Sequence, residues 1–197
     1  MKQMSSSSTL ALPQLGLGMY TLTPEEVTRS ISDGFKAGFR HVDTAPSYKN
    51  SEKAVGEAIQ SSRVPRSEIF LTTKLSPKSM KSYDHVVNAL EGSLKELQTP
   101  YVDCLMVHWP AVAGLSPSDE RNVPLRHDAW HAMEDLKRRG LCRSIAVSNF
   151  LPRHMESLGS HPDINQIELH PLCQQRETVE YCQEHGISIQ QHSPLMA

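Results

Sequence analysis

The chain has 197 residues, of which 38% are hydrophobic, and its formal net charge at pH 7 is -2. This length suits one domain with its own core, and the balanced charge excludes the basic surface that nucleic-acid binding requires. No apolar run approaches the roughly 20 residues of a membrane span, and the polar, serine-rich start lacks the apolar centre of a signal peptide.

The cysteines and histidines argue against disulfides and metal sites. The four cysteines form no C-x-x-C pair, so we expect reduced thiols and a cytoplasmic protein. The ten histidines show no H-E-x-x-H or comparable ligand spacing, so we expect no metal site. Seven of them are interpreted as surface or capping residues: His41, His85, His127, His131, His154, His161 and His185.

The first 40 residues predict a tail, a strand and a helix. Residues 1–9 are expected to be a disordered tail, and residues 10–197 to form one barrel-like domain. A short strand is expected at 15–18. Thr23 and Glu26 then form a capping box with Pro24 in the first turn, and Gly38 ends the helix.

Apolar strands and amphipathic helices alternate through the rest of the chain. A long polar loop, 111–126, is expected to be functional or disordered. Val87, Leu90, Leu94 and Leu97 are expected to face inward on the helix that Ser82 caps. The expected strands are 39–43, 69–74, 102–107, 144–147, 164–168 and 187–190, and helices are expected to begin near 50, 82, 128, 152 and 177.

This alternation predicts a parallel sheet with right-handed crossovers. An open doubly wound sheet would also alternate, but no G-x-G-x-x-G follows the first strand, so we favour a barrel. About seven strands can be counted where a (β/α)8 barrel of the TIM type needs eight. The predicted fold class is therefore α/β, an incomplete (β/α)8 barrel.

Polar side chains stand at or just beyond the ends of the predicted strands. In a parallel barrel these ends share one face, where chemistry takes place. The residues are Asp43, Tyr48, Lys74, His108, Ser148, Asn149 and Gln166.

These residues lie in motifs that resemble the aldo-keto reductase family. The resemblance covers nearly the whole chain, and it rests on six motifs in the family's order, each at a strand end. They are Asp43-Thr44-Ala45-x-x-Tyr48, Thr72-Thr73-Lys74-Leu75, His108-Trp109-Pro110, Ser148-Asn149-Phe150, Asn165-Gln166-Ile167-Glu168-x-His170-Pro171 and Ser193-Pro194-Leu195.

The resemblance implies NAD(P)H-dependent reduction of an aldehyde or ketone to an alcohol. Tyr48 resembles the proton donor, and Lys74 would lower the pKa of its phenol. Asp43 would hold Lys74 by an ion pair, and His108 would orient the substrate carbonyl. A structural ion pair, a plain loop tyrosine and a core histidine are the alternative interpretations of these residues.

The resemblance also implies a nucleotide site and a pocket for a small carbonyl substrate. NADPH is expected, with NADH possible. His192 stands where the family usually places an aromatic ring stacked on the nicotinamide. Tyr20, His108 and Trp109 match the substrate pocket. The matching cofactor positions are Gly18, Met19, Asp43, Ser148, Asn149, Gln166, His192, Ser193 and Leu195.

The family continues beyond the Ser-Pro-Leu motif into a strand and helices, whereas this sequence stops at Ala197. We therefore expect a C-terminally truncated member whose open barrel edges allow self-association. A truncated, non-catalytic fragment that acts as an interaction module is the alternative function. A further alternative is a gene or splice form whose full version continues.

Overall fold

A computed structural model describes residues 12–49 and 51–194, so the predicted tail at 1–9 lies outside the described residues. The seven strands are β1 (Leu17–Gly18), β2 (His41–Asp43), β3 (Phe70–Leu75), β4 (Val102–Val107), β5 (Cys142–Ser148), β6 (Ile164–Glu168) and β7 (Ser188–His192). The α-helices are α1 (Pro24–Lys36), α2 (Ser51–Ser61), α3 (Tyr83–Glu96), α4 (Asn122–Arg138), α5 (Pro152–Glu156) and α6 (Arg176–Glu184), and short 3-10 turns lie at Arg66–Glu68 and Pro77–Ser79.

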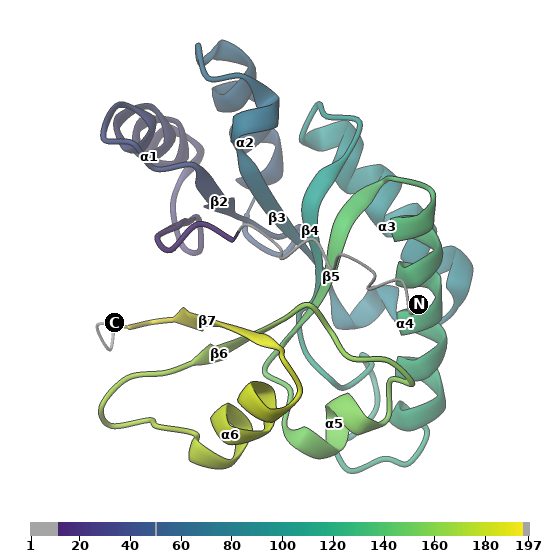
Figure 1. The fold of residues 1–197 in the computed structure, drawn as a ribbon. Coiled ribbons are helices and arrows are strands. Elements are labelled where there is room, and N and C mark those ends of the chain that lie inside the picture. Colours follow the sequence, from purple (N-terminus) through teal and green to yellow (C-terminus); the bar gives the residue numbers. More distant parts are fainter. Residues whose placement is uncertain (1–11, 50, 195–197) are drawn as a thin grey trace, which may run out of the picture.

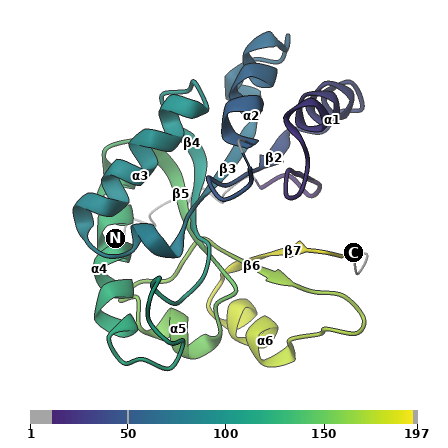
Figure 2. The same cartoon turned by 180° about the vertical axis from the view of Figure 1, so that it is seen from behind.

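The strands form one parallel sheet in the order β1-β2-β3-β4-β5-β6-β7. The sheet curls, and the helices lie along its outer side (Figure 1, Figure 2). This sequential order has no reversal of the kind that defines a doubly wound sheet. The predicted incomplete (β/α)8 barrel is therefore confirmed, with β1 and β7 at the edges of the described sheet.

Two layers of side chains hold the fold together. The larger core fills the space between the sheet and its helices, and it includes Val27, Leu71, Leu90 and Trp130. A smaller cluster of Phe70, Cys104, Met106, Ala146 and Ile164 packs apart from it, with Leu12 against it. Strands β2, β3 and β4 are buried along their whole length, so the side chains on both faces of these strands are shielded from water.

The first helix forms as its sequence predicts. The Thr23 hydroxyl accepts a hydrogen bond from the Glu26 backbone N–H, and the Glu26 carboxylate accepts one from the Thr23 N–H at 2.8 Å. Gly38 follows the helix at φ +96°, a conformation that suits glycine because it has no Cβ. Both helix ends are therefore set locally.

Helix α4 begins six residues before the predicted start at 128, and the loop is correspondingly shorter. The missed signal is Asn122, whose Oδ1 accepts from the Val112 N–H at 2.9 Å and whose Nδ2 donates to the Ser116 carbonyl at 2.8 Å. These bonds fold the loop back on the first turn of the helix. Pro124 is compatible with that turn because proline lacks a backbone N–H, and an N–H at this position would have no partner within the helix.

Two smaller expectations need correction, and a third is incomplete. On α3, Leu90 and Leu97 are buried and Val87 and Leu94 are half-buried against the main core, as expected, but the buried Val86 was missed. Strand β7 extends to His192, two residues beyond the predicted end. His41 is 2% exposed, so the prediction of a surface or capping residue was wrong. It lies on β2, where its Nε2 is 3.1 Å from the Thr72 hydroxyl.

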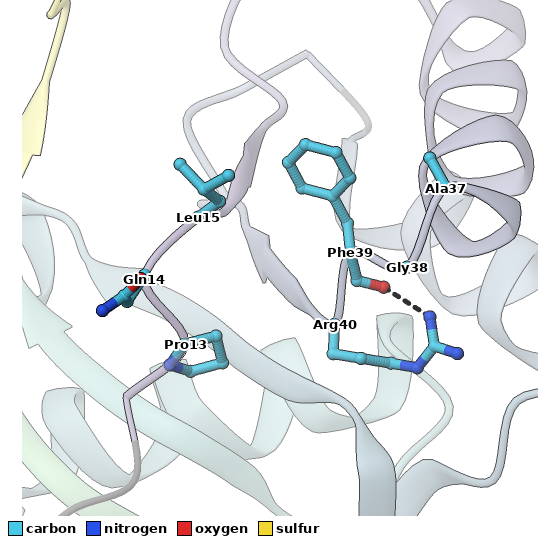
Figure 3. A pocket seen from close by; sticks show the side chains of 7 residues that line it. All are labelled: Pro13, Gln14, Leu15, Ala37, Gly38, Phe39 and Arg40. Carbon is cyan, nitrogen blue, oxygen red and sulfur yellow. Dashed lines mark hydrogen bonds between the residues drawn. The ribbon is translucent and has the colours of Figure 1, made fainter.

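A cavity of about 420 Å³ lies beside the segments that lead into β1 and β2 (Figure 3). The lining includes Arg40, whose guanidinium donates to the Phe39 carbonyl at 2.7 Å. This is the amino-terminal end of the strands, whereas Asp43 and Lys74 stand at the other end. The cavity is therefore separate from the predicted site.

None of the described helices combines the length and hydropathy that a membrane span needs.

We predict opposite effects for two helical glycines. A Cβ on Gly56 of α2 would lie 2.6 Å from the Glu96 carbonyl oxygen, whereas a Cβ on Gly92 of α3 would meet nothing within 4 Å. Gly56→Ala should lower the free energy of unfolding by about 1–3 kcal/mol because the helices must separate. Gly92→Ala should raise it by about 0.5–1 kcal/mol through helix propensity. Urea denaturation measures both, and equal effects would contradict the close approach of α2 to α3.

Candidate active site

Asp43, Lys74 and Tyr48 meet at the carboxyl end of the sheet. Asp43 ends β2, and Lys74 is the fifth residue of β3. The Lys74 ammonium forms an ion pair with Asp43 Oδ1, and its Nζ lies 3.1 Å from the Tyr48 hydroxyl oxygen. The Lys74 side chain is 0% exposed, so its charge is held among these partners and away from water.

Gln166 of β6 completes this group from the far side of the sheet. Its Nε2 donates to Asp43 Oδ2 at 2.8 Å, so both carboxylate oxygens have a hydrogen-bonded partner. A buried carboxylate needs such partners, because an unpaired charge in the interior costs several kcal/mol. The amide of Gln166 therefore fixes the orientation of Asp43, which in turn holds Lys74.

The charges keep Lys74 protonated. Burial lowers the pKa of Lys74, but the opposing charge and hydrogen bond of Asp43 and the contact with Tyr48 raise it above its ordinary value. Lys74 is therefore a permanent cation at neutral pH.

The expected lowering of the Tyr48 pKa is wrong for the net shift in this structure. Burial raises the pKa of Tyr48, and the charge of Lys74 lowers it by less. The charge of Asp43 adds to the increase. Tyr48 is thus a neutral phenol at neutral pH, and the charge of Lys74 lowers the free-energy cost of removing its proton.

His108 follows β4 and lies beside Tyr48. Their ring centroids are 5.7 Å apart with planes at 77°, and the His108 ring also stacks on Trp109 at 6.4 Å. Burial and the charge of Lys74 lower the pKa of His108 to about 4. At neutral pH His108 is therefore an uncharged imidazole with one N–H to donate.

A second polar group lies at the ends of β5, β6 and β7. The Ser148 hydroxyl donates to the Gln166 carbonyl at 2.9 Å, and Asn149 Nδ2 donates to the His108 carbonyl at 3.1 Å. His192 Nε2 lies 3.4 Å from Asn149 Oδ1. Asn149 adopts φ +62°, a left-handed conformation that asparagine tolerates better than most residues. The structure thus brings these predicted residues together.

The other predicted positions have different surroundings. Tyr20 is 68% exposed and Trp109 is 51% exposed, and the Tyr20 ring packs edge-on against Tyr48 at 5.2 Å. The Met19 side chain is buried in the main core, so only its backbone remains for contact with a ligand. A Cβ on Gly18 would meet nothing within 4 Å. Ser193 lies beside His192, at 3.4 Å between Oγ and Nδ1, and Leu195 lies outside the described residues.

The structure also brings together Glu168, His170 and Cys173, a cluster that the sequence analysis did not predict. Their ligand-type atoms lie within 4.8 Å of one another in the described part of the chain, because His170 and Cys173 pair across a tight turn. His170 Nε2 is 2.9 Å from the Glu168 carboxylate, and its Nδ1 accepts from the Leu172 N–H at 3.2 Å. Since both ring nitrogens are engaged within the turn, hydrogen bonding accounts for this cluster.

Comparison with known proteins identifies the family. The profile of the Aldo/keto reductase family matches residues 14–197. The chain belongs to the aldo/keto reductase family. An aldo-keto reductase of Mycobacterium sp. (strain JLS) is 40% identical over 189 residues, and methylglyoxal reductase DkgA of Escherichia coli (strain K12) is 41% identical over 188 residues. These alignments cover 94% and 93% of this chain and 64% of each relative, so the chain spans about 64% of their length.

Solved structures of aldo-keto reductases have the same fold. An aldo/keto reductase from Brucella melitensis superposes with a TM-score of 0.84 at 40% identity, covering 94% of this chain and 70% of that one. A Bombyx mori aldo-keto reductase solved in complex with NADP gives a TM-score of 0.80 at 35% identity, covering 92% and 62%. The curled seven-stranded sheet therefore matches part of the barrel of these relatives.

We predict that His108 titrates far below the ordinary range of histidine. Because its pKa is lowered in the folded protein, the unfolded chain binds more protons between pH 6.5 and about 4. Through His108, stability should therefore fall as the pH drops through this window. NMR titration of the ring, with the signal assigned by its loss in His108→Asn, should give a midpoint near 4.

Exposed His131 provides the control for this titration. His131→Asn should leave the His108 signal and its midpoint unchanged. A His108 midpoint near 6.5 would contradict the buried, neutral imidazole.

Proposed function

We propose that this chain reduces an aldehyde or ketone to an alcohol with NADPH. The main support is the 3.1 Å contact between the Tyr48 hydroxyl and the buried Lys74 ammonium, with the His108 ring beside it. The family supports the same reaction, since one relative is named a methylglyoxal reductase and another was solved with NADP.

The side chains at the ends of β5, β6 and β7 suit the nicotinamide group of such a cofactor. A carboxamide presents an acceptor oxygen and a donor NH2, and the amides of Asn149 and Gln166 offer complementary groups. Gln166 donates to Asp43 through Nε2, so its side-chain oxygen Oε1 is the atom that would accept from a ligand. The imidazole of His192 offers a flat face, and Gly18 leaves space for close approach. NADH remains the alternative nucleotide.

The protein's part in the proposed reaction is to hold and move one proton. Bound NADPH would supply a hydride to the carbonyl carbon. As that C–H bond forms, Tyr48 gives its hydroxyl proton to the carbonyl oxygen and becomes a phenolate. The Lys74 ammonium, 3.1 Å away, stabilises the new negative charge, and Asp43 holds Lys74 in place. The neutral His108 donates a hydrogen bond that orients the carbonyl.

The surroundings of Tyr48 favour a small-molecule substrate. Tyr20 and Trp109 are exposed aromatic side chains on this side of the sheet, and they suit the apolar part of a carbonyl compound.

We also propose a cytoplasmic location, which agrees with the four free cysteines in the described part of the chain.

The sheet edges favour a second candidate, a catalytically impaired barrel that acts as an interaction module. Within residues 12–49 and 51–194, β1 and β7 each pair with one neighbouring strand only. An unpaired strand edge can add another strand, including one from a second copy of the chain.

Fluorescence titration with NADPH, followed by light scattering to measure the molecular mass, distinguishes the two candidate functions. Micromolar nucleotide binding by a monomer would exclude the interaction module.

We predict that Tyr48→Phe lowers turnover by a factor of about 10²–10⁴, because the ring remains while the transferable proton is lost. NADPH affinity should stay within about twofold, since Tyr48 is proposed to contact the carbonyl. NADPH consumption at 340 nm with a panel of aldehydes measures turnover. Tyr83→Phe, an exposed tyrosine of α3, is the matched control and should retain full activity. Equal turnover in the two variants would show that Tyr48 is not the donor.

A further inference from the structure

Glu52 is a buried carboxylate for which the proposed reaction has no use. It lies in the first turn of α2 and is only 6% exposed. Its Oε1 accepts a hydrogen bond from the Thr73 hydroxyl at 2.5 Å. Burial raises the pKa of Glu52, while hydrogen bonds from Thr73 and Ser93 oppose that shift. An apolar residue would avoid this burial cost, so packing alone does not explain a carboxylate here.

The position of this hydrogen bond relates it to the site. Thr73 directly precedes Lys74 on β3, and neighbouring residues of a strand point to opposite faces. Lys74 reaches inward to Asp43 and Tyr48, whereas Thr73 faces the helix layer and meets Glu52. The Glu52–Thr73 bond therefore joins α2 to the strand that carries the ammonium.

The turn that carries Tyr48 is joined to the same place. The Ser51 backbone N–H donates to the Tyr48 carbonyl at 2.7 Å, and the Ser51 and Thr44 hydroxyls lie 2.8 Å apart. The Thr44 N–H donates to the Thr72 carbonyl at 3.0 Å. The phenol, the start of α2 and the end of β3 thus form one cross-linked unit.

Helix α2 also has little freedom to move away. Gly56, one turn after Glu52, lets the helix approach so closely that a Cβ would lie 2.6 Å from the Glu96 carbonyl oxygen. Apolar packing of this kind holds the helix against its neighbours but is not directional. The short carboxylate–hydroxyl bond adds the direction, because it fixes where along β3 the helix begins.

We propose that Glu52, through its hydrogen bond with Thr73, is a positioning residue that sets the separation between the Tyr48 phenol and the Lys74 ammonium. The structural part of this proposal stands on the geometry alone. Its consequence for turnover rests on the proposed carbonyl reduction.

The test compares two substitutions of the strand residue. Thr73→Val removes the hydroxyl but keeps the β-branched shape, whereas Thr73→Ser keeps the hydroxyl and loses only a methyl group. Thr178→Val, at a buried threonine of α6, is the control for loss of a buried hydroxyl elsewhere. Glu52→Gln weakens the same bond from the other side and serves if Thr73→Val does not fold.

The main measurement needs no turnover. Tyrosine labelled with carbon-13 at Cζ gives one NMR signal per ring, and loss of a signal in Tyr48→Phe assigns Tyr48. We expect the Tyr48 signal and its titration midpoint to move in Thr73→Val and Glu52→Gln, and to match the parent in Thr73→Ser and Thr178→Val. A Tyr48 signal that superimposes on the parent in both Thr73→Val and Glu52→Gln would overturn the proposal, even if both variants melt at lower temperature.

Kinetics then separate this proposal from the proposed function. In Thr73→Val we expect kcat to fall roughly 10- to 100-fold, the range expected for a misplacement near 1 Å, with NADPH affinity within about twofold. Thr73→Ser should restore most of the loss. If the folded parent consumes no NADPH while the Tyr48 signal still moves in Thr73→Val, the carbonyl reduction fails and the positioning role stands. If the parent turns over and kcat is unchanged in Thr73→Val, the positioning role fails.

Discussion

The candidate site depends on one buried ion pair, that of Asp43 and Lys74. Removing both charges from water costs several kcal/mol for each ion, so the pair persists only if its other polar contacts are satisfied. Gln166 supplies one of these contacts from β6, and Tyr48 supplies another from the turn after β2. The pair thereby organises side chains from three parallel strands around a single charge.

This arrangement gives three ionisable groups at the site a definite protonation state. Lys74 stays charged, and the same charge helps to keep His108 neutral. Burial keeps the proton on Tyr48. A neutral phenol, a cation beside it and an uncharged imidazole are the states that the proposed proton transfer to a carbonyl oxygen uses. The charge of Lys74 therefore lowers the pKa of both neighbouring rings. It opposes the effect of burial at Tyr48 and adds to that effect at His108.

The sequence predicted the fold class and the meeting of Asp43, Tyr48 and Lys74 because strand ends in a parallel barrel share one face. It failed where the deciding contact is distant or lies inside a loop. The start of α4 depends on Asn122 bonding back to the loop, and the burial of His41 depends on Thr72 of the neighbouring strand. The net pKa of Tyr48 was misjudged because a charge partner can be read from a motif, whereas burial depends on the assembled structure.

Strand order also bears on how the charged centre forms during synthesis. Asp43 and Lys74 are 31 positions apart within one strand–helix–strand unit, whereas Gln166 is 123 positions from the carboxylate that it braces. Short loops close at lower entropic cost than long ones, and chains emerge from the ribosome amino end first. Asp43 and Lys74 can accordingly pair on the nascent strands while water still solvates the carboxylate, and the Gln166 contact becomes necessary only once the rest of the sheet buries the pair.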